Sequence, residues 1–195
     1  MMTFAEYYAE LQKREGHIPL TLVEAWPPEL IMDIESDLRS AVVAQDFKST
    51  ICNLRPRSSN QSIGNQVEDF VMPKITSNLT RFKLEKCVGA GYPDRMLSRD
   101  GHRIAMEVKA TSDWNPADSN RRVLTSSSEK LRKHFRPPIH HLLCTVFYSQ
   151  DRDCATINAV RLDFLEPTSP VSVRLEVSVS HKLLAEGRHH SLVIR

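Results

Sequence analysis

YPDRMLSRDGHRIAMEVKAT, residues 92–111, consists of two runs of alternating side chains separated by the pair Asp100-Gly101. An Asp-Gly pair favours the two-residue turn of a β-hairpin, because both central positions of that turn need a positive φ angle. The stretch therefore predicts a hairpin whose register follows from the turn, with Arg99 facing His102.

Two carboxylates meet in this hairpin, because the same register places Asp94 opposite Glu107, with Cβ atoms roughly 5 Å apart. Side chains alternate between the two faces of a strand, so Lys109 lies on the same face as Glu107. The other face is apolar and is expected in the core; it carries Ile104, Met106, Val108 and Ala110. Facing like charges are destabilising unless a cation lies between them, and Mg²⁺ accepts such oxygen ligands. We therefore expect Asp94 and Glu107 to bind Mg²⁺, with Lys109 beside a metal-bound water.

An exposed ion-pair cluster is the alternative interpretation of these three charges. Acid-x-Lys triplets are common, and the chain has another, Asp46-Phe47-Lys48, at the end of an expected helix with no second acid placed to join it. The Glu107 triplet has the preceding Pro93-Asp94, the hairpin and the matching face, so we favour the metal site there.

Composition describes a soluble globular protein with one domain of 195 residues. The net charge of +2 is too small to indicate a polyanionic partner by itself. The four cysteines are widely spaced, without a C-x-x-C pair, and the first residues lack the apolar core of a signal peptide. These features predict reduced thiols, a cytoplasmic location and no association with a membrane.

Periodicity predicts helices first and strands later. Helical spacing of apolar residues covers residues 3–16, 28 to about 47, 66–75 and 126–135, and a loop is expected over residues 53–65. Strands are expected at 82–88, 141–149 and 155–165, and valines alternate with polar residues over 171–179. The paired histidines, His140-His141 and His189-His190, do not predict a zinc site, because adjacent residues on a strand point to opposite faces.

Pro93-Asp94, followed after twelve residues by Glu107-Val108-Lys109, resembles the signature of the PD-(D/E)XK nuclease superfamily, which includes most type II restriction endonucleases. The order of expected elements over about residues 62–150 is also similar to the core of that family. The resemblance implies an α/β fold of the α+β type, with a restriction-endonuclease-like core in which helices flank a central mixed β-sheet. We expect one nuclease domain over residues 1–195, with N-terminal helices in 1–50, the catalytic core in about 62–150 and C-terminal strands in 155–195.

The resemblance also implies roles for individual residues. Asp94 and Glu107 would be metal-binding carboxylates, Val108 would offer its backbone carbonyl to the metal, and Lys109 would act on the nucleophilic water. Glu68 is similar to the additional catalytic acid that many members carry on the helix before the sheet. The implied reaction is Mg²⁺-dependent hydrolysis of phosphodiester bonds in double-stranded DNA, leaving 5′-phosphate and 3′-hydroxyl ends.

Basic and amide side chains after the hairpin are the candidates for holding DNA, since Arg and Lys contact phosphates and side chains in a groove contact bases. We expect residues 113–126 to contact bases and the earlier loop to contact the backbone. The DNA-binding candidates are Arg55, Arg57, Asn115, Asn120, Arg121, Arg122, Lys130 and Lys133.

Three functions remain open on the sequence. The favoured one is a sequence-specific type II restriction endonuclease that acts as a homodimer, because symmetric DNA sites are usually matched by symmetric dimers. The second is a repair or recombination endonuclease of the same fold that recognises mismatches or junctions. The third is a non-catalytic DNA-binding module, which would not need Mg²⁺.

Overall fold

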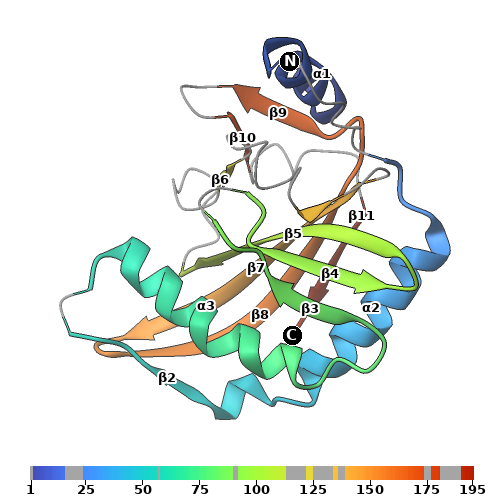
Figure 1. Ribbon diagram of the computed structural model, residues 1–195. Helices are drawn as coiled ribbons and strands as arrows, with labels where there is room; N and C mark the ends of the chain where they lie inside the picture. The colour runs from blue at the N-terminus through green and yellow to red at the C-terminus, as the bar shows by residue number, and fades with distance from the viewer. Residues whose placement is uncertain are drawn as a thin grey trace.

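The computed structural model describes residues 2–15, 24–56, 58–89, 92–112, 122–124, 134–135, 139–173, 177–180 and 190–195. They form a mixed α and β structure in which helices flank a curled, mixed β-sheet (Figure 1). Within these ranges, no helix combines the length and the apolar character needed to cross a membrane.

The larger sheet contains seven strands. Six of them follow the order β11 (His190–Ile194), β8 (Cys154–Leu165), β7 (His140–Asp151), β5 (His102–Thr111), β4 (Arg95–Arg99) and β3 (Lys83–Lys86), and β2 (Ile51–Asn53) also pairs with β8. The β5–β7 pair is parallel, and the other pairs are antiparallel. A mixed sheet with strands near the expected positions confirms the predicted fold class.

The hairpin of β4 and β5 has the predicted register. Asp100 and Gly101 form its turn with φ angles of 49° and 86°, so both residues adopt the conformation that the Asp-Gly pair tolerates best. Arg99 pairs with His102, and the ladder continues in step as far as Arg95 and Met106. Asp94 lies one residue before this ladder, so continuing the register by one position would place it opposite Glu107.

The two faces of β5 pack against different apolar clusters. Ile104, Met106, Val108 and Ala110 pack with α2 (Pro28–Val43) and α3 (Asn60–Thr76) in the larger cluster, as predicted. Ala105, on the face of Glu107, belongs to a smaller cluster that includes Phe4 of α1 (Phe4–Glu15). The charged face is therefore partly covered, which explains how a glutamate on it can be buried.

Helix α1 begins at the predicted capping box, but the end of α2 and the start of α3 differ from the predicted positions. Thr3 and Glu6 exchange hydrogen bonds of 2.7 and 3.2 Å in a capping box at the start of α1. The second helix ends at Val43, because the chain turns there and enters the 3₁₀ helix η1 (Phe47–Ser49). The loop expected to extend to residue 65 is shorter, because α3 already begins at Asn60. Ser59 is its N-cap, and its hydroxyl accepts a hydrogen bond of 3.3 Å from the backbone N–H of Ser62.

A smaller sheet accounts for the remaining strands. It has the order β1 (Met2–Thr3), β9 (Pro170–Val173), β10 (Val177–Ser180) and β6 (Arg122–Leu124), with antiparallel pairing throughout. The alternating valines thus form two paired strands in this sheet. Of the helix expected over residues 126–135, only the last two residues are described.

Helix α2 holds the turn end of the hairpin through two aspartates. Asp37 is buried and accepts hydrogen bonds of 2.8–3.0 Å from Thr80, Arg81 and Phe82, directly before β3. Asp33 accepts a hydrogen bond of 2.5 Å from Arg99, the last residue of β4. These contacts fix the position of the hairpin on the helical layer.

Candidate functional site

Asp94 lies directly before β4 and is held on two sides. Its carboxylate Oδ2 accepts a hydrogen bond of 3.1 Å from the backbone N–H of Val108. Its carbonyl oxygen accepts one of 2.8 Å from the N–H of Cys87. The carboxylate therefore lies against the middle of β5, where it also interacts with the carboxyl group of Glu107.

Glu107 and Lys109 form a buried ion pair on the same face of β5. Lys109 Nζ lies 2.7 Å from Glu107 Oε1, and the two side chains are 23% and 4% exposed. The other carboxylate oxygen, Oε2, is buried and has no hydrogen-bond donor among the described residues. The structure thus brings Asp94, Glu107 and Lys109 together, and it leaves one acidic oxygen with free coordination capacity.

Glu68 reaches the same region from α3, but its contact is with Arg95, which is not among the predicted site residues. Arg95 Nη2 lies 3.5 Å from Glu68 Oε1, and both side chains are largely buried. Arg95 pairs with Met106 and so occupies a core-facing position of β4. A charged residue at such a position needs a buried partner, and that pattern was the signal available in the sequence.

Burial and mutual repulsion shift the pKa values of these groups. Burial raises the pKa of Glu107 to about 8; nearby Asp94 adds to the rise, and Lys109 opposes it. Burial also raises the pKa of Glu68, again with a contribution from Asp94. Burial alone would lower the pKa of Lys109, but the carboxylates of Glu107 and Asp94 outweigh it and the pKa is raised. The site therefore favours bound positive charge.

The raised pKa of Glu107 predicts a pH-dependent stability in the metal-free protein. Between pH 4.5, its ordinary value, and about 8, the folded state keeps a proton that the unfolded state releases. The free energy of unfolding therefore falls as the pH rises through this window, by a few kcal/mol from this group. Urea unfolding in EDTA at several pH values measures this slope. We expect Glu107→Gln to flatten it, and equal slopes in the two proteins would contradict the assignment.

The donor set suits a hard divalent cation. The carboxyl groups of Asp94 and Glu107 interact, one oxygen of Glu107 is unsatisfied, and oxygen ligands are those that Mg²⁺ prefers. No group of three or more His, Cys, Asp or Glu side chains is placed to hold a metal within the described ranges. Mg²⁺ commonly binds through one or two carboxylates and completes its shell with water and substrate phosphate, so Asp94 and Glu107 fit that mode.

Most of the predicted DNA-binding residues lie outside the described residues: Arg57, Asn115, Asn120, Arg121, Lys130 and Lys133. Arg122 belongs to β6, so part of the segment over residues 113–126, which is expected to contact bases, is a strand. Arg55 is exposed between β2 and α3. Its backbone N–H donates a hydrogen bond of 2.7 Å to Gln66, which orders the short loop that carries it.

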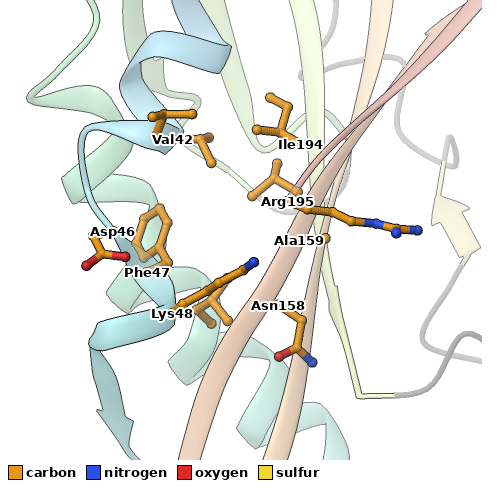
Figure 2. Close-up of a pocket in the computed structure, with 11 residues that line it drawn as sticks. Val42, Asp46, Phe47, Lys48, Asn158, Ala159, Ile194 and Arg195 are labelled. Carbon is orange, nitrogen blue, oxygen red and sulfur yellow. The ribbon is translucent and has the colours of Figure 1, made fainter.

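A pocket of about 170 Å³ lies away from these carboxylates, between the end of α2, η1, β8 and β11 (Figure 2). Its lining includes Asp46, Phe47 and Lys48, the second acid-x-Lys triplet. Asp46 has the one acidic side chain among the described residues that line this pocket, and Phe47 is buried in the core. The pocket therefore lacks the paired acids that distinguish the hairpin site.

No protein-family model matches the chain, and no curated protein sequence matches it. Among solved structures, the restriction endonuclease BglI bound to its DNA recognition sequence is similar to this chain with a TM-score of 0.43. The two share 12% sequence identity over 85% of this chain and 86% of that chain.

Proposed function

We propose that this protein is a Mg²⁺-dependent endonuclease that hydrolyses phosphodiester bonds in double-stranded DNA and leaves 5′-phosphate and 3′-hydroxyl ends. The observation that carries the proposal is the contact of Asp94 with β5, where its carboxylate accepts a hydrogen bond from Val108 N–H and interacts with Glu107, which lies 2.7 Å from Lys109. The same residues carry the resemblance to the PD-(D/E)XK nucleases.

Each side chain has a distinct task in this proposal. Asp94, Glu107 and the carbonyl of Val108 would hold Mg²⁺, whose chemistry is to stabilise charge on the phosphate and to lower the pKa of an attacking water. Lys109 donates hydrogen bonds from a permanently charged ammonium and would orient that water. Glu68 would act less directly, because its carboxylate is already paired with Arg95.

We further propose that the enzyme is a site-specific type II restriction endonuclease, cytoplasmic and homodimeric. A symmetric pair of sites would cut both strands of a symmetric DNA sequence. Arg55 is a candidate contact to the DNA backbone, because its side chain is exposed on an ordered loop.

The test is cleavage of plasmid and phage DNA by the purified protein in Mg²⁺ or in EDTA. We expect discrete fragments in Mg²⁺ and none in EDTA, and sequencing of the ends would give the recognition site. Cleavage confined to mismatched or branched substrates would instead support a repair or recombination enzyme. Binding of DNA without cleavage of any substrate would contradict the nuclease proposal and favour a DNA-binding module.

A further inference from the structure

Tyr92 and His141 form a buried polar pair next to the candidate site. The Tyr92 hydroxyl lies 2.5 Å from His141 Nδ1, and both residues are at most 1% exposed. Their rings stack with centroids 5.7 Å apart and an interplanar angle of 13°. Burial lowers the pKa of His141 to about 3, so the imidazole is neutral, and the tautomer of His141 determines which partner donates in its hydrogen bond with the Tyr92 hydroxyl.

This pair connects the segment that carries Asp94 to a strand on the far side of β5. His141 lies on β7, in parallel register with Ala105 of β5. Tyr92 and Ala105 belong to the same apolar cluster, and Phe4 packs edge-on to the His141 ring at 5.1 Å. The Tyr92 ring, two residues before Asp94, is therefore held by its hydrogen bond, by stacking on His141 and by the surrounding apolar cluster.

Asp94 needs such support because it lies outside the regular ladder of β4, which begins at Arg95. Its described contacts are the hydrogen bonds with Cys87 and Val108 and the interaction with the carboxyl group of Glu107. The Tyr92 hydroxyl adds a directional contact on the N-terminal side, which a phenylalanine ring of the same shape would not provide.

We propose that Tyr92 is a positioning residue that, through its hydrogen bond to His141, holds the Asp94 carboxylate in the orientation for binding a divalent cation beside Glu107. The inference rests on the proposed function, since it concerns the same metal site. Groups that orient metal ligands typically change metal affinity about 10–100-fold when they are removed.

The test measures binding of Mn²⁺ by the EPR signal of the free ion, for the wild type and for Tyr92→Phe. We expect Tyr92→Phe to weaken Mn²⁺ binding about tenfold and to raise the Mg²⁺ concentration for half-maximal cleavage by a similar factor. DNA affinity without divalent metal should be unchanged. Tyr7→Phe is the matched control, because Tyr7 is a buried tyrosine of the same cluster that lies far from Asp94 in sequence, on α1.

A double variant separates positioning from packing. If the hydroxyl acts through His141, Tyr92→Phe combined with His141→Leu should lose no more Mn²⁺ affinity than His141→Leu alone. Equal Mn²⁺ affinity of the wild type and Tyr92→Phe, or equal losses in Tyr92→Phe and Tyr7→Phe, would overturn the positioning role while leaving the nuclease proposal intact. A wild type that neither binds Mn²⁺ through Asp94 nor cleaves DNA would overturn both.

Discussion

Lys109→Ala is expected to lower the single-turnover rate of DNA cleavage about 10²–10⁴-fold, the usual contribution of a side chain that acts on a reacting proton. The substitution removes the ammonium that lies 2.7 Å from Glu107. It also removes the group that holds down the pKa of Glu107, so the carboxyl keeps its proton to a higher pH. Residual activity should therefore rise with pH, as measured by plasmid cleavage over a pH series at fixed Mg²⁺.

Lys48→Ala is the matched control for Lys109. Both lysines end an acid-x-Lys triplet, but Lys48 lines the separate pocket beside η1. We expect its replacement to leave cleavage within a few-fold of the wild type. Equal activity of Lys109→Ala and Lys48→Ala would show that the hairpin triplet is a structural ion pair.

Asp94→Asn is expected to reduce Mg²⁺-dependent cleavage about 10²–10⁴-fold, because a metal ion supplies several kcal/mol of transition-state stabilisation and each 1.4 kcal/mol is a factor of ten. The asparagine oxygen can still accept the hydrogen bond from Val108 N–H, so the fold should be kept while the charge is lost. Titration of Mg²⁺ in the cleavage assay should give a higher half-maximal concentration, and circular dichroism should show an unchanged fold.

Asp100→Asn makes the same chemical change in the same hairpin. Asp100 is exposed at the turn with a φ of 49°, a conformation that asparagine tolerates well. We expect this variant to cleave DNA like the wild type. If both variants retained full activity, Asp94 would not be a metal ligand.

The hairpin could be predicted from sequence because its geometry is local. A single turn pair sets the register, and the alternation of side chains then fixes which residues share a face. The predicted pairing of Arg99 with His102 and the apolar face of β5 are confirmed. The first turn of α3 is polar, so apolar periodicity predicts a start at residue 66, whereas the helix begins at Asn60 after the Ser59 cap.

The contacts of Glu68 and Tyr92 could not be predicted, because they join residues that are distant in the chain. Glu68 meets Arg95 across the packing of α3 on the sheet, and Tyr92 meets His141 across β5. Such pairs depend on the packing of a helix on the sheet and on the order of strands within it, which periodicity does not contain. The division of the C-terminal strands between two sheets depends on the same long-range packing.

The hairpin is held at both ends, by Asp33 at its turn and by the Cys87–Asp94 hydrogen bond at its open end. A site built on such an element is preorganised, so its charges need little rearrangement when charge develops on a substrate. A rigid site cannot itself open to let a duplex enter or leave. We therefore expect the conformational steps of DNA capture and product release to occur in elements outside the hairpin.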